Sequence, residues 1–425
     1  MEQKIYQEAA ERFGTPCYIF DLDEFKDRIA SVQALLGDRA EVCFAMKANP
    51  FLIKAASEQA SYLEVCSPGE FAICERAGVP MEQIVMSGVN KEEKDIRYVV
   101  EHYGSRVTYT VESLLHLERL QRAAQEYGER LPILLRVTSG NQFGLSEELV
   151  RQIIDQRGRY SALDFKGLQY FSGTQKKRMK VLEEELLYMD RLLMDLENAG
   201  YVAEVLEFGP GLFIDYFARD GEIDELGLLK EFAGLFSKLR AHKRLKLELG
   251  RYLAASCGAY LTSIVDQKVN KDQGFCIVDG GIHQVNYYGQ TMAMKIPRYH
   301  QLKQGSMQLN KEGQLSKESV ELNNEGREVA ADGKEMWNIC GSLCTINDLI
   351  VKNLPLTQAA VGDVLVFENT GAYSVTEGMA IFLSRDLPKV LYYDKKQGLR
   401  IARDRVETNF LNCDAQTLTG CRVQY

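Results

Sequence analysis

Lys47 is the side chain of this sequence that is best placed to act as a covalent nucleophile. It lies in the segment VCFAMKANP, residues 42–50, where a short apolar run ends in a polar turn. A lysine that is partly buried at the end of a strand loses some of its tendency to stay protonated, and a neutral amine can form a Schiff base with a carbonyl compound. The same segment also fits the polar end of an ordinary strand, so both interpretations stay open on this stretch alone.

Polar residues and glycines also follow several later apolar runs. These residues are Glu64, Arg136, Gly209, Gly211, Glu248, Gly250 and Arg251. The apolar runs, each followed by a helical pattern, span residues 42–46, 62–66, 83–87, 106–110, 132–136, 166–171, 204–208 and 244–248. If these runs are parallel strands of one barrel, their C-terminal ends meet at one rim, where barrel enzymes keep their active sites.

The alternation of runs predicts an α/β fold. Continuous apolar runs separated by amphipathic helices, such as those expected over residues 23–36, 112–127 and 181–199, indicate parallel strands that helices cover. Eight such units in about 220 residues match the strand number and typical size of a (β/α)8 barrel. An open, doubly wound sheet is the alternative that the periodicity allows.

The chain outside these units has a different pattern. After Leu253 the sequence gives strand-like runs such as AYLTSIV, FCIVDGG, VLVFENT and KVLYYD, together with a polar stretch from Gln304 to Lys334. An N-terminal helix and an early strand at Pro16 to Phe20 precede the barrel. We therefore predict a barrel over residues 25–254, and a β-rich domain formed by residues 1–24 and 255–425.

The composition is that of an ordinary globular enzyme, with 45% hydrophobic and 26% charged residues. The formal net charge of −9 argues against nucleic acid or an anionic membrane as a partner, because both need a concentrated basic face. The first residues lack the apolar core of a signal peptide, and we expect a cytoplasmic protein without membrane spans. The 10 cysteines are scattered singly, so no metal site is predicted from them.

The chemical groups on the predicted rim meet the needs of pyridoxal phosphate. Backbone amides at Gly209 and Gly211 could approach a phosphate group where no Cβ obstructs them, although GPG could also be a plain turn. Lys47 supplies an amine for the cofactor aldehyde. Glu248 supplies a carboxylate that could keep a pyridine nitrogen protonated, which makes the ring an electron sink.

Seven motifs identify a family resemblance along nearly the whole chain. The sequence resembles the fold-type III pyridoxal-phosphate decarboxylases, the group of diaminopimelate and ornithine decarboxylases, which share a barrel with alanine racemase. The motifs are FAMKAN (44–49), EVCSPGE (64–70), LLRV (134–137), FGPGLF (208–213), ELGRYLAA (248–255), GSLCTINDL (341–349) and NTGAYS (369–374). Seven motifs in the family's order are far more specific than any one of them.

The resemblance implies a set of cofactor contacts. Lys47 would bind the cofactor and Glu248 would hold the pyridine nitrogen. Glu64, Arg136 and Phe171 would complete the cofactor pocket, with Phe171 replacing the family's ring-stacking histidine, and an aromatic ring can still stack on the pyridine face. The residues expected around the phosphate are Gly209, Gly211, Gly250, Arg251 and Tyr373.

The resemblance also implies a homodimer with shared active sites. In the family, the cysteine of the C-x-x-x-D motif comes from the second subunit and donates a proton to the carbanion that remains after carbon dioxide leaves. Here that cysteine is Cys344, with Asp348 nearby as a further catalytic residue. If the match holds, the β-rich domain completes the active site of the partner subunit.

Departures from the family pattern concern the substrate. Thr345 follows the cysteine where the family carries an acidic residue for a distal ammonium. The family's arginine and proline are missing from GGIHQVNYYGQ (280–290), so His283 and Tyr287 become candidate substrate contacts together with Thr345. The motifs are similar to those of the branch with the butirosin-pathway decarboxylase, which acts on glutamate tethered to a carrier protein.

Four functions remain open from the sequence. The main expectation is decarboxylation of an amino acid or amino-acid derivative that is not free meso-diaminopimelate. A diamino-acid decarboxylase with a divergent pocket is the nearest alternative. An amino-acid racemase or an inactive binding homologue would belong to another class, and CTIND at residues 344–348 favours decarboxylation over racemisation.

Overall fold

The computed structural model describes residues 1–217, 223–241, 244–303 and 334–414. The chain divides into two compact units: residues 1–24, 215–222 and 255–425 form one, and residues 25–214 and 223–254 form the other. The predicted polar stretch at residues 304–334 lies almost entirely outside the described residues.

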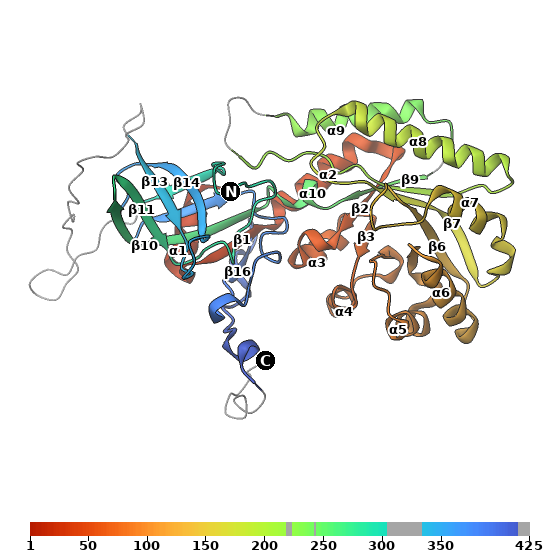
Figure 1. Cartoon of the computed structure of the whole chain (residues 1–425), viewed down its shortest axis with the longest axis horizontal. Helices are drawn as coiled ribbons and strands as arrows, with labels where there is room; N and C mark the ends of the chain where they lie inside the picture. The colour runs from red at the N-terminus through yellow and green to blue at the C-terminus, as the bar shows by residue number, and fades with distance from the viewer. Residues whose placement is uncertain (218–222, 242–243, 304–333, 415–425) are drawn as a thin grey trace, which may run out of the picture. The chain divides into compact units, whose positions relative to one another are not determined.

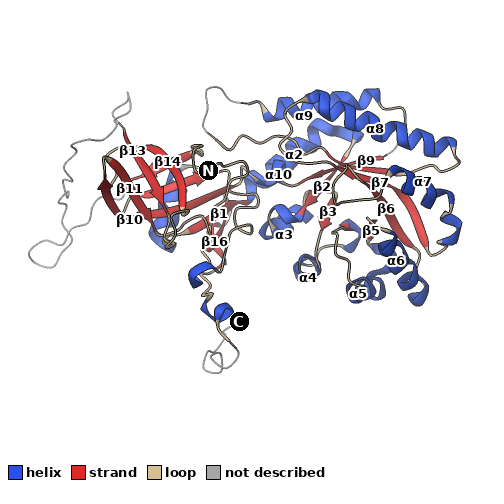
Figure 2. Ribbon diagram, viewed as in Figure 1, coloured by secondary structure: helices blue, strands red, loops and turns tan. Residues whose placement is uncertain are grey.

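The second unit is a closed barrel of eight parallel strands, which confirms the predicted fold class (Figure 2). Its strands are β2 (Glu41–Ala45), β3 (Tyr62–Val65), β4 (Ile84–Met86), β5 (Thr108–Val111), β6 (Leu131–Val137), β7 (Leu163–Phe171), β8 (Val205–Gly209) and β9 (Arg244–Leu249). The barrel closes where β2 pairs with β9, with Val42 opposite Leu247. All eight apolar runs are therefore strands, and the open doubly wound sheet is excluded.

Helices between the strands cover the outside of the barrel (Figure 1). They are α2 (Leu22–Leu36), α3 (Ile53–Ser57), α4 (Pro68–Ala77), α5 (Glu93–Tyr103), α6 (Leu114–Tyr127), α7 (Glu147–Asp155), α8 (Met179–Asn198), α9 (Glu225–Gly234) and α10 (Arg251–Ala254). Their ends follow local chemistry. Ser113 caps α6 by accepting a hydrogen bond from the His116 amide, and Gly128 ends the helix with φ of 71°.

The first unit is built mainly of strands. Its elements are α1 (Gln3–Phe13), β1 (Cys17–Asp21), β10 (Gly258–Asn270), β11 (Gln273–Val278), β12 (Tyr299–Leu302), β13 (Glu335–Cys340), β14 (Leu349–Leu356), β15 (Val364–Glu368), β16 (Lys389–Asp394) and β17 (Gly398–Arg403). β1 lies between β10, to which it is antiparallel, and β16, to which it is parallel. The N-terminal strand is thus a central member of a sheet whose other strands come from the far end of the chain.

The core of this unit joins α1 to the sheet. Ile5, Tyr6 and Ala9 of α1 pack on Ile19 and Leu261 in one buried apolar cluster. Burial of a leucine or isoleucine side chain stabilises a fold by about 1.5–3 kcal/mol. Within the part of the chain that the structure describes, no helix has both the length and the apolar character to cross a membrane.

Candidate active site

Lys47 lies in a short 3-10 turn, η2 (Met46–Ala48), directly after β2. The strands on either side of β2 each contribute a glutamate, because Glu64 of β3 is the register partner of Ala45 and Glu248 of β9 is the partner of Cys43. The Lys47 Nζ lies 2.7 Å from Glu64 Oε2 and 3.1 Å from Glu248 Oε1. Both acids are buried, with 1% and 6% of their surface exposed. The barrel therefore brings three predicted site residues together at its C-terminal end.

The two acids differ in their ionisation. Burial opposes the charge of Glu64, but the ammonium of Lys47 and a hydrogen bond with Glu248 outweigh it and lower the pKa of Glu64. Burial and the adjacent charge of Glu64 raise the pKa of Glu248. Two buried carboxyl groups beside one ammonium do not both ionise readily. The two shifts thus favour a charged Glu64 in the pair with Lys47 and a protonated Glu248.

Phe171 contributes an aromatic ring to the same end of the barrel. The Lys47 Nζ lies 5.8 Å from the centre of this ring. Gly209 is the register partner of Phe171 on the neighbouring strand, and a Cβ at that glycine would lie 2.4 Å from Phe171 Cδ2. The glycine therefore leaves room for the ring, which is a second reason for a glycine at the end of β8.

The loops after β7 and β8 pack closely on one another. Gly211 has φ of +58°, and a Cβ there would lie 1.9 Å from the carbonyl oxygen of Gly173. The amide of Lys176 donates to the carbonyl oxygen of Gly211 at 2.9 Å. Arg251, at the start of α10, points its Nε to Thr174 Oγ1 at 3.4 Å. The predicted phosphate residues Gly209, Gly211, Gly250 and Arg251 thus lie in neighbouring loops at one rim.

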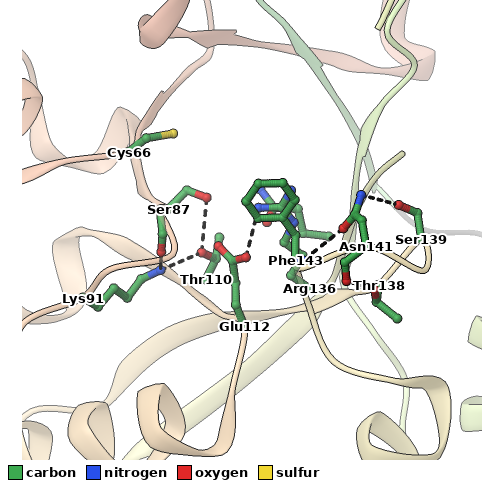
Figure 3. A network of polar contacts seen from close by, with 12 residues as sticks. Cys66, Ser87, Lys91, Thr110, Glu112, Arg136, Thr138, Ser139, Asn141 and Phe143 are labelled. Carbon is green, nitrogen blue, oxygen red and sulfur yellow. Dashed lines mark hydrogen bonds and ion pairs between the residues drawn. The ribbon is translucent and has the colours of Figure 1, made fainter. Parts of the chain in front are cut away.

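Arg136, at the end of β6, is held on two sides. Its Nη1 donates to Glu112 Oε2 at 3.1 Å, and its guanidinium carbon lies 4.8 Å from the centre of the Phe143 ring (Figure 3). Arg136 is 9% exposed and Glu112 is 8% exposed. Its charge helps to lower the pKa of Glu64, so the guanidinium belongs to the same electrostatic site as Lys47. Glu112 and Phe143 were not predicted as site residues.

A buried lysine lies beside this ion pair (Figure 3). Lys91 is 2% exposed, and its Nζ donates to the carbonyl oxygen of Gly88 at 2.5 Å and to Thr110 Oγ1 at 3.2 Å. Burial lowers the pKa of Lys91 to about 8, although Glu112 opposes this shift. Lys91 was not predicted as a site residue, because it lies in a connection after β4 and not at the end of an apolar run.

The β-rich unit gathers the residues of the CTIND motif in one loop. Asp348 is 3% exposed, and its carboxylate accepts hydrogen bonds from the amide of Ile282 at 2.8 Å and from the amide of Leu343 at 2.7 Å. It therefore ties the loop after β11 to the loop that carries Cys344. Cys344 and Thr345 are accessible, since Cys344 is exposed and Thr345 is half-buried.

The remaining predicted residues of this unit have different surroundings. His283 is 3% exposed, and burial lowers its pKa to about 4. Tyr287 is 5% exposed and donates its hydroxyl to the carbonyl oxygen of Glu368 at 2.6 Å, so a substrate contact would have to replace that bond. Tyr373 has φ of 68°, a left-handed conformation that non-glycine residues rarely adopt. The roles of these three residues stay predictions.

The groups around Lys47 fit pyridoxal phosphate. An amine, a carboxyl group that holds a proton, an aromatic ring and close-packed glycine loops lie at one end of one barrel. These are the groups that could bind an aldehyde, a pyridine nitrogen, the face of a planar ring and a phosphate. No residue of this set conflicts in charge or chemistry with the cofactor.

Comparison with known proteins identifies the same chemistry. The model of the family described as "Pyridoxal-dependent decarboxylase, pyridoxal binding domain" matches residues 22–255. The L-glutamyl-[BtrI acyl-carrier protein] decarboxylase of Niallia circulans is 24% identical, covering 89% of this chain and 88% of the relative. The diaminopimelate decarboxylase of Neisseria meningitidis serogroup A is 26% identical, covering 88% of this chain and 89% of that enzyme.

Solved structures agree in fold. The diaminopimelate decarboxylase of Helicobacter pylori in complex with L-lysine superposes with a TM-score of 0.78 at 20% identity, covering 96% of this chain and 98% of that one. The lysine/ornithine decarboxylase of Vibrio vulnificus in complex with cadaverine gives 0.75 at 18% identity, covering 92% of this chain and 98% of that one. At these identities the likeness concerns the fold alone.

Proposed function

The chain belongs to the pyridoxal-dependent decarboxylases, and from this premise we propose that it removes the α-carboxylate of an amino acid or amino-acid derivative other than free meso-diaminopimelate. Its general class is a pyridoxal-phosphate-dependent amino-acid decarboxylase similar to diaminopimelate decarboxylase. The observation that carries the proposal is the position of Lys47 between two buried glutamates beside Phe171. The substrate is the part that has to be inferred.

Each residue of the barrel site has a proposed task. Lys47 would hold the cofactor covalently until the substrate amine takes its place. Glu248 would hold a proton at the pyridine nitrogen, and Phe171 would cover one face of the ring. Pyridoxal phosphate, when bound, supplies an acceptor for the electron pair that remains at Cα when carbon dioxide leaves.

The β-rich unit would supply the proton donor. Cys344 is exposed, and the buried carboxylate of Asp348 fixes the start of its loop through the amide of Leu343. We propose that Cys344 of one subunit donates the proton that Cα takes up in the active site of its partner. This assignment makes the functional protein a homodimer with shared sites, in which Asp348 acts by positioning the loop.

Thr345 supports a substrate without a free distal ammonium. A neutral hydroxyl stands where the family resemblance implies an acidic side chain, and Thr345 Oγ1 already accepts from the amide of Asn347 at 3.4 Å. A distal ammonium would lose its ion pair there. We therefore propose that the substrate is a derivatised amino acid. The name of the Niallia circulans relative suggests one such form, an amino acid attached to a carrier protein.

The cofactor assignment is tested by replacing Lys47. The purified protein should show the visible absorbance of a lysine-bound cofactor, and Lys47→Ala should abolish that band while the protein stays folded by circular dichroism. Lys54→Ala, a change at a lysine in α3, is the control and should keep the band. A visible band that survives in Lys47→Ala would contradict the assignment.

The substrate is tested by release of carbon dioxide from a panel. The panel contains free lysine, ornithine, diaminopimelate and glutamate, and glutamate attached to a carrier protein. We expect turnover only with substrates whose distal amine is absent or blocked. Efficient turnover of free diaminopimelate would replace our proposal with a diamino-acid decarboxylase that has a divergent pocket.

A further inference from the structure

The inside of the barrel contains a charged layer beneath the lysine site. Barrel interiors are usually filled by branched apolar side chains. Here Gln169 of β7, Glu207 of β8 and Lys246 of β9 are 1%, 0% and 3% exposed. Side chains two apart on a strand point to the same face, so Lys246 lies one interior position below Glu248. The layer is therefore buried directly under the site and is not part of its rim.

The contacts of this layer join three strands. Gln169 Nε2 donates to Glu207 Oε1 at 2.7 Å. Glu207 and Lys246 are register partners on neighbouring strands. The Lys246 Nζ lies 3.3 Å from the centre of the Tyr62 ring on β3. Among the described residues, the other oxygen of Glu207 is buried without a hydrogen-bond partner.

Charge balance couples this layer to the site above it. Three buried acids, Glu64, Glu207 and Glu248, share the interior with two lysines, Lys47 and Lys246. An unbalanced buried carboxylate is costly, so the excess acid retains a proton. Burial raises the pKa of Glu207 to about 7 against the opposing effect of Lys246, and the charge of Glu64 adds to the increase.

We infer that Glu207 and Lys246 are positioning residues whose combined charge determines where the proton of the Glu64 and Glu248 pair is held. The inference rests on the proposed function in one respect, namely that Lys47 binds the cofactor above this layer. The ionisable groups that face Glu207 and Lys246 are Glu41, Cys43, Lys47, Tyr62, Glu64, Arg244 and Glu248. When Glu207 is ionised, its charge balances that of Lys246 and the layer is neutral.

The test follows the visible absorbance of the loaded protein as a function of pH. Glu207→Gln keeps the shape of the side chain but leaves Lys246 as an unbalanced cation. An added positive charge disfavours the protonated form of the chromophore. The midpoint of the change in visible absorbance with pH should therefore move by about one pH unit toward lower pH. Glu204→Gln is the matched control. Glu204 directly precedes β8, its side chain is exposed, and it pairs with Lys166 at 2.9 Å.

A second change should reverse the first. In Glu207→Gln/Lys246→Met the layer is neutral again, and the midpoint should return to within about 0.3 units of the wild type. A purely structural role predicts that the second core substitution adds damage and does not restore the midpoint. An unchanged midpoint in Glu207→Gln, or one that the second change does not restore, would overturn the inference.

A milder variant keeps the test usable if Glu207→Gln does not fold. Gln169→Leu removes the hydrogen bond that favours the charged form of Glu207. The midpoint should then move in the same direction by a smaller amount, and no movement in this folded variant would count against the inference. Absence of a visible band in the wild type would instead refute the proposed function, so the two failures are distinguishable.

Discussion

At the scale of single residues, the site depends on the unequal roles of chemically identical groups. Glu64 and Glu248 both contact Lys47, yet only Glu64 has a lowered pKa. A proton on Glu248 can be shared with a basic nitrogen, whereas Glu64 keeps its charge for the ammonium. Burial does not distinguish the two acids, because both are almost completely buried. The difference arises because Glu64 lies nearer the Lys47 ammonium, and the charge of Glu64 then opposes ionisation of Glu248.

Arg136 gives a prediction at the same scale. We expect Glu112→Gln to weaken cofactor binding about tenfold, because the guanidinium loses the carboxylate that holds it at 3.1 Å. The dissociation constant of pyridoxal phosphate is measured in Glu112→Gln, in Arg136→Gln and in the double variant. If Glu112 acts through Arg136, its replacement has no further effect once Arg136 is changed.

A control separates this effect from general damage to the barrel. Glu126 pairs with Arg97 on the outside of the barrel, where both side chains are exposed by more than 40%. Glu126→Gln should leave the dissociation constant unchanged. Fully additive effects of Glu112→Gln and Arg136→Gln would show that Glu112 does not position the arginine.

At the scale of elements, Gly211 is a position where the rim leaves no room for a side chain. Gly211→Ala combines a left-handed φ of +58° with a contact of 1.9 Å to a backbone oxygen. Gly128→Ala has a similar φ of +71° but no atom within 4 Å of the added Cβ, so it measures the backbone strain alone. We expect Gly211→Ala to lose about 2 kcal/mol more than Gly128→Ala in urea unfolding.

The same comparison should appear in cofactor binding. Gly128 ends α6 far along the chain from the loops after β7 and β8, so its substitution should leave the affinity for pyridoxal phosphate unchanged. Gly211→Ala should reduce that affinity, because the loop has to move away from Gly173. Equal losses of stability in the two variants would mean that the loop can relax around the new methyl group.

The elements also show what the sequence could and could not predict. The runs VCFAM and LLRV were identifiable as strands because apolar residues are continuous when both faces of a strand are covered. Their ends gave Lys47 and Arg136. Phe171 was found through the family resemblance, as the replacement of a ring-stacking histidine, and its fit against Gly209 required the register of β7 and β8.

The missed residues share a physical reason. Glu207 and Lys246 stand inside apolar runs, and only the pairing of β8 with β9 shows that both belong to one interior layer. The alternation of leucine with Lys246 and Glu248 in RLKLEL was the available indication of polar residues on one face. Lys91 and Glu112 were not predicted, because they lie in separate segments that connect strands to helices. The closed barrel brings these segments together, and the local sequence carries no information on such contacts.

At the scale of the whole molecule, buried histidines predict acid sensitivity. Burial lowers the pKa of His283 to about 4, below its ordinary value near 6.5. Between these values the unfolded chain binds more protons than the folded one, so stability falls as pH decreases from about 6.5 to 4. His283→Gln should reduce the loss of unfolding free energy between pH 6.5 and 4 by about 2 kcal/mol.

This prediction is checked by urea unfolding at a series of pH values. His102→Gln is the control, because His102 is exposed on α5 and should leave the slope of stability against pH unchanged. His116 is buried with a pKa lowered to about 4, so part of the acid sensitivity should survive in His283→Gln. A slope identical to that of the wild type would show that His283 takes up its proton at the same pH in the folded and the unfolded chain.

The proposed dimer places the two halves of the chemistry on different units of the chain. Lys47 lies in the barrel unit, and Cys344 lies in the β-rich unit. If each site takes Lys47 from one subunit and Cys344 from its partner, Lys47→Ala and Cys344→Ala homodimers both lack complete sites. A mixed dimer keeps one site with both residues intact, since the two defects fall together in its other site.

Mixing the two inactive variants therefore gives a direct measurement of site sharing. After unfolding and joint refolding in equal amounts, half of the dimers are mixed, and each mixed dimer has one intact site of two. The expected turnover is about a quarter of the wild-type value, whereas sites built within one subunit would give none. The readout is release of carbon dioxide with the substrate that the panel identifies, and each variant refolded alone provides the baseline.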